Sequence, residues 1–377
     1  MTPALGLYLH IPFCRQRCDF CSFYLEVHRE PAAEAFCRAL EMEINLYAAE
    51  PSFKDRRIAS LYFGGGTPTV LRTELLAGLL DTAQRSFHLR PDCEITVEAH
   101  PGTVTVLNLA ALRHHGVTRI SFGAESFADE ELASVGRPGA HAETIAAVMS
   151  ARAAGFADIN LDLMYGLPGQ TLKSWERTLR ACIHLSPTHI SCYALMVEEG
   201  TRLAHEVHRA HRQEPDELLQ IEMDRLAQDI LGQAGYEQYE ISNYARAGFR
   251  CRHNLLYWTQ GEYLGVGPSA QSLIGNVRFG NVANLTSYRV ALTENRLPVQ
   301  DRTVLTAQEQ LRDAVIFGLR LRQGIPTSQL KTHVENYGHV EIWRELCGDQ
   351  LIEEDGGRSR LSAKGRLFAD TIAERLF

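Results

Sequence analysis

Long apolar runs are absent from this sequence of 377 residues. The first apolar stretch, residues 5–11, is short and has no cationic leader, so we expect neither a signal peptide nor a membrane span. A positive charge balance is also missing, because the formal net charge is -8. This argues against a broad nucleic-acid interface, which needs a basic face. The sequence also lacks internal repeats and low-complexity tracts.

A disulfide framework is missing as well. The chain has nine cysteines, but six of them stand alone in the sequence, without the regular spacing of a disulfide-stapled domain. Isolated cysteines in a chain of this length suit a reducing compartment, and we predict the cytosol. The six are Cys37, Cys93, Cys182, Cys192, Cys251 and Cys347.

The composition is that of a globular protein. Apolar residues make up 45% of the chain and charged residues 22%, which is enough to bury a large core in about two domains. The N-terminal half alternates strand-like and helix-like segments, the pattern of a parallel sheet with covering helices. We therefore predict an α/β fold, a partial (β/α)6 barrel of the TIM-like kind. The expected strands are residues 5–11, 58–63, 93–99, 117–122, 158–164 and 189–195, and the expected helices include 31–49, 73–87, 105–115, 140–154 and 171–184.

Three cysteines follow the first expected strand at the spacing C-x3-C-x2-C: Cys14, Cys18 and Cys21. Thiolates spaced this closely can each hold one iron of a [4Fe-4S] cluster and leave the fourth iron without a cysteine ligand. An open iron can chelate S-adenosylmethionine (SAM), and the spacing resembles the signature loop of the radical SAM enzymes, in which the reduced cluster cleaves SAM to a 5′-deoxyadenosyl radical. The alternatives are buried structural cysteines or a zinc site completed by His10 or His28, although no second C-x2-C pair is present.

Polar and glycine-rich residues follow the other expected strands, where the functional residues of barrel-like α/β folds collect. Residues 64–68 read Gly-Gly-Gly-Thr-Pro, and glycine lets the main chain approach a ligand closely. Glu98, Glu125 and Asp162 lie at or near the next strand ends, where carboxylates can accept hydrogen bonds from ribose hydroxyls. Each feature has a structural alternative, as a βα turn, a helix N-cap or a rim ion pair. Their recurrence at successive strand ends favours a binding site.

Several stretches together resemble the HemN/HemW group of radical SAM proteins over nearly the whole chain. Arg137 would supply the cation for a carboxylate of the cofactor. The group usually has glutamine where this chain has Glu125, so Glu125 either pairs with a cation such as Arg137 or weakens cofactor binding. The matching stretches are residues 6–14, 64–68, 98–102, 136–137, 160–171 and, more weakly, 361–367. The resemblance implies that Cys14, Cys18 and Cys21 hold the cluster and that Tyr8, Gly65, Gly66, Thr67, Glu98, Arg137, Asp162 and Ala194 line the SAM pocket, with Glu125 as a ninth cofactor-binding residue.

Three features separate the two branches of the group. The HemN branch, the oxygen-independent coproporphyrinogen III dehydrogenases, has a long extension before the cysteine loop and a further cysteine two residues after the third one. This chain starts almost at the loop and has Phe23 at that position. Residues 253–258, HNLLYW, resemble the H-N-x-x-Y-W motif of HemW, the heme chaperone branch. We therefore expect a heme chaperone, with radical decarboxylation of coproporphyrinogen III as the alternative.

The HNLLYW motif offers groups that can hold heme. A neutral imidazole is a common axial ligand of heme iron, and aromatic rings can cover a porphyrin plane, so we predict His253, Tyr257 and Trp258 as heme contacts. Cys251 is a competing soft ligand, and other histidines, such as His10 and His100, also compete. The structural alternative is that the motif pins a loop against the barrel. Because the motif lies beyond the barrel in sequence, we expect SAM binding and heme binding to be separable.

The C-terminal part has a different pattern. We expect a helix over 216–234, a strand over 235–241, a glycine-rich bridge over 261–280 and a helix over 307–320, then a hairpin at 355–357 and a last helix capped by Ser362. These elements resemble a small winged-helix-like domain, for which the acidic balance favours a lid or docking role. We divide the chain into a radical SAM barrel (1–240), a connecting segment with the motif (241–300) and a C-terminal helical domain (301–377). Expected partners are heme and a recipient hemoprotein, free or membrane-bound, and the sequence leaves a homodimer open.

Overall fold

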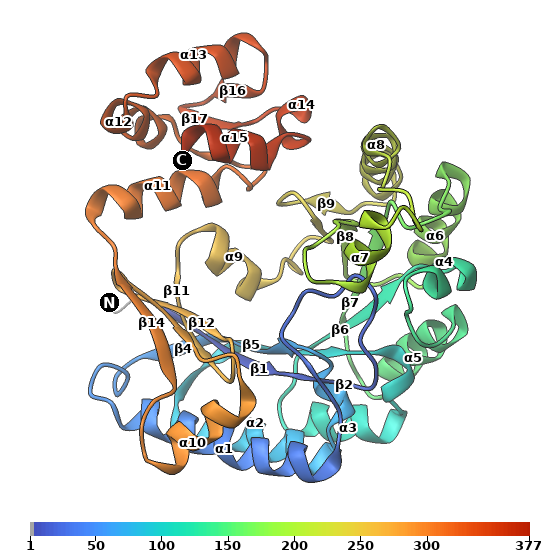
Figure 1. Ribbon diagram of the computed structural model, residues 1–377, viewed down its shortest axis with the longest axis vertical. Helices are drawn as coiled ribbons and strands as arrows, with labels where there is room; N and C mark the ends of the chain where they lie inside the picture. The colour runs from blue at the N-terminus through green and yellow to red at the C-terminus, as the bar shows by residue number, and fades with distance from the viewer. Residues whose placement is uncertain (1–3) are drawn as a thin grey trace.

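The computed structural model describes residues 4–377, and its largest element is a twelve-stranded sheet (Figure 1). Six strands run parallel and in chain order through the middle of this sheet. In the first of them, Leu5, Leu7, Leu9 and Ile11 are 0% exposed, as expected for a buried parallel strand. The predicted partial (β/α)6 barrel is confirmed. The six strands are β1 (Leu5–Ile11), β4 (Arg57–Gly65), β5 (His88–Ala99), β6 (Arg119–Glu125), β7 (Asp158–Tyr165) and β8 (His189–Ala194).

Helices cover the outer side of the parallel strands (Figure 1). Two of them begin at capping boxes, in which Thr105 pairs with Asn108 and Thr171 with Ser174, so the turn from strand to helix is specified locally. In the part of the chain that the structure covers, no helix is long and apolar enough to cross a membrane. The covering helices are α1 (Glu30–Ala49), α2 (Thr73–Ser86), α3 (Val106–His114), α4 (Asp129–Ser134), α5 (His141–Ala153), α6 (Leu172–His184) and α8 (Glu217–Gln233).

The sheet extends beyond the barrel at both edges. The glycine-rich segment expected as a bridge forms strands instead: β11 (Glu262–Val266) pairs parallel with β1, and β12 (Gln271–Ile274) and β13 (Val277–Asn281) follow antiparallel. A later strand, β14 (Val299–Val304), pairs antiparallel with β13 at the edge of the sheet. Glycine is required there because a Cβ on Gly265 would lie 2.3 Å from the carbonyl oxygen of Gln271. At the other edge, the strand expected over 235–241 is reduced to β9 (Glu237–Gln238), beside β10 (Asn243–Ala245).

A buried carboxyl group ties the edge extension to the barrel. Glu43 of α1 is 0% exposed and accepts hydrogen bonds from the amide of Gly267 (2.8 Å), from Asn281 Nδ2 (2.6 Å) and from the hydroxyl of Tyr288 in α10 (Leu285–Thr293). Burial raises the pKa of Glu43 to about 7, against the opposing effect of these three donors. The network fixes the added strands against the helical layer.

The C-terminal residues form a separate packing unit, drawn in orange to red in Figure 1. Its apolar core includes Val315, Leu330, Leu346 and Leu361, and a three-stranded sheet packs against its helices. This arrangement is the predicted helical, winged-helix-like domain. One detail differs, because the single helix expected after Ser362 is two helices. The elements are α11 (Ala307–Gly318), β15 (Ile325–Pro326), α12 (Thr327–Tyr337), α13 (Val340–Gly348), β16 (Ile352–Asp355), β17 (Arg358–Leu361), α14 (Ala363–Arg366) and α15 (Ala369–Leu376).

Candidate functional site

The carboxyl ends of the parallel strands surround a cavity of about 640 Å³. All three clustered cysteines line it, together with seven of the nine residues predicted to contact SAM: Gly65, Gly66, Thr67, Glu98, Glu125, Arg137 and Asp162. Tyr8 and Ala194 are not among the lining residues. The Tyr8 hydroxyl lies 3.2 Å from Nδ1 of His10, and Tyr193, the neighbour of Ala194, lines the cavity in its place.

The cysteine loop forms one wall of the cavity. The thiol of Cys14, in β2 (Phe13–Cys14), lies 3.4 Å from the hydroxyl of Thr67, and Nη1 of Arg137 lies 3.8 Å from Sγ of Cys18. Burial raises the pKa of all three thiols, and the positive charge of Arg137 opposes that shift. None of the three is in a disulfide. Within residues 4–377, no three His, Cys, Asp or Glu side chains converge on the position of a single metal ion.

Glycines bring the loop after β4 close to the cysteine loop. Gly65 has a φ of 106°, and a Cβ there would lie 2.5 Å from the ring of His10. A Cβ on Gly66 would lie 2.6 Å from the carbonyl oxygen of Phe13. Three free thiols therefore face the cavity beside a backbone that only glycine can place there. This donor set fits a cluster held by three thiolates.

Three carboxylate side chains, those of Glu98, Glu125 and Asp162, also line the cavity. Glu98 accepts a hydrogen bond from the Tyr62 hydroxyl (2.7 Å) and one from the Gly65 amide (3.2 Å), and burial raises its pKa to about 7. Asp162 accepts from Ser121 Oγ and from Asn160 Nδ2, both at 2.9 Å. Hydrogen bonds from neighbouring residues therefore fix the positions of both carboxylates at the edge of the cavity.

Glu125 pairs with Arg137, the first of the two arrangements considered for it. Its Oε1 lies 3.4 Å from Nη2 of Arg137, and both side chains are largely buried. Burial raises the pKa of Glu125 to about 7, while the Arg137 charge lowers it. Glu125 also has a φ of 59°, at an irregularity in the pairing of β6 with β7. The carboxylate that replaces the usual glutamine is thus compensated within the site.

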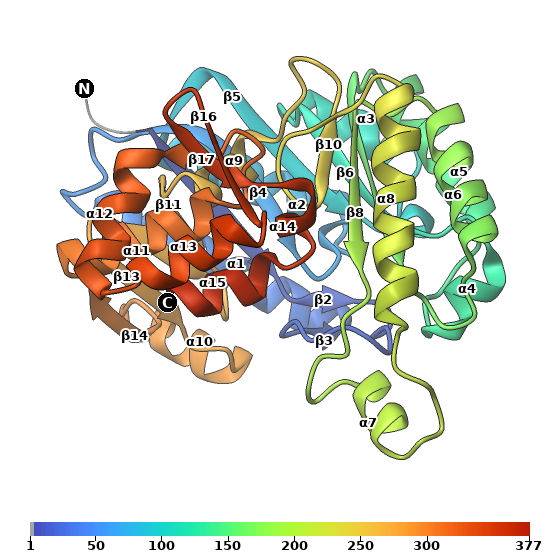
Figure 2. The ribbon, with the colours of Figure 1, turned by 90° about the horizontal axis from the view of Figure 1, so that it is seen from above.

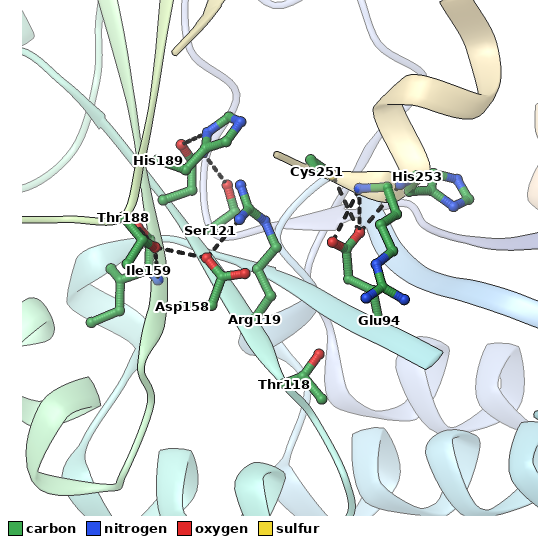
Figure 3. Close-up of polar contacts among 12 residues, drawn as sticks. Glu94, Thr118, Arg119, Ser121, Asp158, Ile159, Thr188, His189, Cys251 and His253 are labelled. Carbon is green, nitrogen blue, oxygen red and sulfur yellow. Dashed lines mark hydrogen bonds and ion pairs between the residues drawn. The ribbon is translucent and has the colours of Figure 1, made fainter. Parts of the chain in front are cut away.

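The HNLLYW motif forms helix α9 (Arg252–Trp258), which lies between the barrel and the C-terminal domain (Figure 1). Its first turn is held by Glu94 of β5, whose carboxylate accepts from the amides of Arg252 (3.0 Å) and His253 (3.2 Å). Figure 3 shows Glu94 beside His253. His253 is 1% exposed, and its ring nitrogens lie 2.9 Å from Ser60 Oγ and 2.9 Å from the Tyr257 hydroxyl. Neither ring nitrogen is free, so the heme-ligand role of His253 stays a prediction.

Trp258, at the other end of α9, lines a second cavity of about 260 Å³ against the C-terminal domain. Phe317 and Arg320 form part of its wall, and the Arg320 guanidinium lies 4.9 Å from the centre of the Trp258 ring. The indole Nε1 of Trp258 is buried and has no hydrogen-bond partner among the described residues. Of the three motif residues predicted to contact heme, Trp258 is the one that lines either of the two cavities described here.

Comparison with known proteins agrees with this geometry. The chain matches the family model of the radical SAM superfamily over residues 8–182 and that of the HemN C-terminal domain over residues 305–368. It is 36% identical to the heme chaperone HemW of Mycobacterium tuberculosis over 98% of this chain and 94% of that protein. The chain belongs to the HemW family. The HemW of Bacillus subtilis is 32% identical over 97% of each chain. The solved coproporphyrinogen III oxidase (HemN) of Escherichia coli superposes with a TM-score of 0.87 at 27% identity, over 99% of this chain and 90% of that one.

In this HemW family member, the cysteine loop is also held from outside the barrel, at Asp19. Its carbonyl accepts from the amide of Leu203 (2.9 Å), in α7 (Arg202–His208), a helix that stands out from the rest of the molecule in Figure 2. Its carboxylate is 7% exposed and lies 3.6 Å from both Arg202 and Arg212. Asp19 is thus held between two arginines from one segment, residues 202–212, which consists of α7 and the residues after it and is called the arm below.

We expect the Arg202→Ala/Arg212→Ala double variant to lose cluster iron several-fold faster than the parent protein. The double substitution leaves the Asp19 carboxylate buried without a cation. The cysteine loop should therefore favour conformations that expose this carboxylate to water. The measurement is the rate of iron release to a chelator under anaerobic conditions. Arg209→Ala, an exposed change on the same arm, is the control. Equal release rates in the double variant and the control would show that the ion pairs of Asp19 with Arg202 and Arg212 do not stabilise the cluster.

Some contributors to the site were missed in the sequence. Tyr62, Ser121 and Asn160 hold the predicted carboxylates, and Tyr62 and Ser121 also line the cavity. They occur inside strands, where a polar side chain can equally face solvent or an adjacent helix. Asn160 and Asp162 are two residues apart and so share one face of β7, which is the signal that could have identified Asn160.

Proposed function

We propose that this protein is a heme chaperone that binds a [4Fe-4S] cluster, SAM and heme, and passes heme to a recipient hemoprotein. The observation that supports the cofactor part is that three free thiols, Arg137 and several carboxylates line one cavity. The heme part is supported by the full-length similarity to proteins named heme chaperone HemW.

The residues that line the larger cavity have separate proposed roles in binding the cluster and SAM. Cys14, Cys18 and Cys21 would hold the cluster, whose bound form supplies an iron open to SAM and, when reduced, an electron for cleavage of its sulfonium. Arg137 offers a planar set of donors that suits the SAM carboxylate. Glu98 and Asp162 offer acceptors for its ammonium or ribose hydroxyl groups. The glycine loop at 64–66 excludes side-chain bulk between the cysteine loop and Glu98.

For heme, we propose Trp258 as the first contact. It borders a cavity between α9 and the C-terminal domain, and the nearby Arg320 carries a positive charge that suits a propionate. Arg320 already pairs with Asp370 at 2.9 Å, so a propionate would share or replace that partner. A His253–iron bond would require the loss of at least one of the two hydrogen bonds that the ring makes.

The second candidate function is oxidation of coproporphyrinogen III by hydrogen abstraction. The observation that favours it is the superposition on HemN from Escherichia coli, an enzyme with that name and a TM-score of 0.87 to this chain. Against it, Phe23 stands where the HemN branch has a further cysteine. The Phe23 side chain lines the SAM cavity and is 64% exposed.

The deciding experiment compares heme retention with product formation in the same anaerobically reconstituted protein. We expect tight heme retention and no conversion of coproporphyrinogen III in the presence of SAM and a reductant. Trp258→Ala should lower heme affinity, whereas Trp343→Ala, a tryptophan change in the C-terminal domain away from α9, should not. Turnover of coproporphyrinogen III without heme retention would overturn the chaperone assignment in favour of the enzyme.

We also propose the compartment and the division of the chain. All nine cysteines are free, which supports the cytosol or another reducing compartment. We retain the boundaries 1–240, 241–300 and 301–377 as functional regions. The middle region carries α9 and adds strands to the barrel sheet, and the last has its own apolar core. The proposed recipient is a hemoprotein, free or membrane-bound.

A further inference from the structure

The ring of His253 packs against the inner face of the barrel rather than against solvent. Its plane stacks on Tyr62 of β4, with ring centres 5.1 Å apart and an interplanar angle of 28°. Gly6 of β1 makes room for α9, because a Cβ there would lie 2.5 Å from Cδ1 of Leu256 and 3.2 Å from Cε1 of His253. Hydrogen bonds to Ser60 and Tyr257 hold both ring nitrogens, so the ring has one orientation.

Tyr62 in turn holds Glu98. Its hydroxyl donates to Oε1 of Glu98 at 2.7 Å, and the other carboxylate oxygen accepts from the amide of Gly65 at 3.2 Å. Gly64 leaves the room for this contact, because a Cβ there would lie 2.9 Å from Cε1 of Tyr62 and 3.0 Å from the Glu98 carboxyl carbon. A continuous set of contacts therefore runs from α9, through one tyrosine, to a carboxylate at the edge of the larger cavity.

We propose that His253 is a positioning residue for the SAM site: it fixes the ring of Tyr62, and Tyr62 fixes the carboxylate of Glu98. The inference rests on the proposed function only in taking Glu98 as a SAM contact. It gives the HNLLYW motif a role in cofactor binding that does not require contact with heme. It also replaces the expectation that SAM and heme binding are separable, since the motif lies far from the barrel strands in sequence but against them in space.

Charge and burial are consistent with this role. Burial lowers the pKa of His253 to about 3, so the imidazole is neutral near pH 7, with one nitrogen donating and the other accepting. A neutral, doubly bonded ring suits a fixed support. The stacked Tyr62 ring cannot tilt toward α9 while His253 fills that space, and a tilt would carry the hydroxyl away from Glu98.

The test measures SAM affinity by calorimetry in cluster-loaded protein with four variants. Tyr62→Phe removes only the hydroxyl that reaches Glu98, and we expect affinity to fall about fivefold. We expect a similar loss in His253→Ala. The Tyr62→Phe/His253→Ala double variant should show little further loss, because both changes act through the contact between Tyr62 and Glu98. His253→Phe, which keeps an aromatic face against Tyr62 and has no iron-binding nitrogen, should retain most of the affinity.

A second readout avoids both the cluster and SAM. Hydrogen exchange of the Gly65 amide, which donates to Glu98, should become faster in the apoprotein of Tyr62→Phe and His253→Ala. His333→Ala is the matched control, since His333 is also fully buried but lies in α12 of the C-terminal domain. It should lower the melting temperature without changing Gly65 exchange or SAM affinity.

The outcomes separate this inference from the proposed function. If Asp162→Ala weakens SAM binding while Tyr62→Phe and His253→Ala do not, the pocket stands and the positioning role is wrong. Additive losses in the double variant would also overturn it. If His253→Ala does not fold, Tyr62→Phe and His253→Phe still decide the question. Faster Gly65 exchange with unchanged SAM affinity in all variants would reject Glu98 as a SAM contact.

Discussion

Replacing Cys18 with alanine is expected to leave reconstituted protein with only background iron and sulfide. Three thiols face the cavity, and each is expected to hold a different iron, so the loss of one leaves two irons of the cube without a cysteine. The same result is expected for Cys14→Ala and Cys21→Ala. Anaerobic iron and sulfide assays with absorption spectra of the purified variants measure the effect.

The chain supplies its own controls for this experiment. Cys37 lies on the buried face of α1 in the barrel core, and Cys347 packs in the C-terminal domain. Cys37→Ser and Cys347→Ser should therefore keep the iron content of the parent protein, even if the first lowers the melting temperature. Parental iron in Cys18→Ala would contradict the assignment of the cysteine loop and return the three cysteines to a structural role.

Replacing Arg137 with alanine is expected to weaken SAM binding by about 10- to 100-fold, the effect of losing a hydrogen-bonded charge at a carboxylate. Arg137 is largely buried, pairs with Glu125 and lies within 3.8 Å of the Cys18 sulfur, so its charge acts at short range on this side of the cavity. Asp162→Ala should also weaken binding. Calorimetry with SAM on cluster-loaded protein measures both, and parental affinity in both variants would reject the pocket.

Glu125→Gln is the companion change, because it restores the residue that the HemN/HemW group usually has. The carboxylate is already paired with Arg137, so we expect the change to move SAM affinity by no more than a few-fold. In the Arg137→Ala variant the opposing charge is gone, so the pKa of Glu125 should rise further and its carboxyl should take up a proton near neutral pH. A large gain in affinity on Glu125→Gln alone would show that the carboxylate repels the cofactor despite its partner.

The barrel could be predicted from the sequence because its signals are local. The apolar run at residues 5–11 and the strand-helix alternation that follows placed six parallel strands within a few residues of where they lie. The same reliance on local signals explains why the glycine-rich segment 261–280 is predicted as a bridge and not as strands. Its glycines resemble a linker, yet the structure shows strands that approach one another so closely that Gly265 cannot carry a Cβ.

The candidate site was predictable in part. Strand ends meet at one edge of a parallel barrel, so residues that follow separate strands, such as Thr67, Glu98 and Asp162, could be grouped from the sequence alone. Tyr62 and Ser121 could not be assigned to the site, because the sequence does not show which side chain a polar residue inside a strand contacts. The ion pairs of Asp19 were also missed, since the two arginines lie more than 180 residues away in an arm with no distinctive pattern.

The sequence by itself determined the cysteine loop, the order of the strands and the family resemblance, since spacing, periodicity and motif are properties of neighbouring residues. Only the tertiary structure decided how distant side chains meet: Glu125 with Arg137, Asp19 with two arginines, and His253 with Ser60 across 193 positions of sequence. The physical reason is that these contacts depend on strand register and on where α9 packs. Both are set by the packing of the whole core rather than by any local pattern.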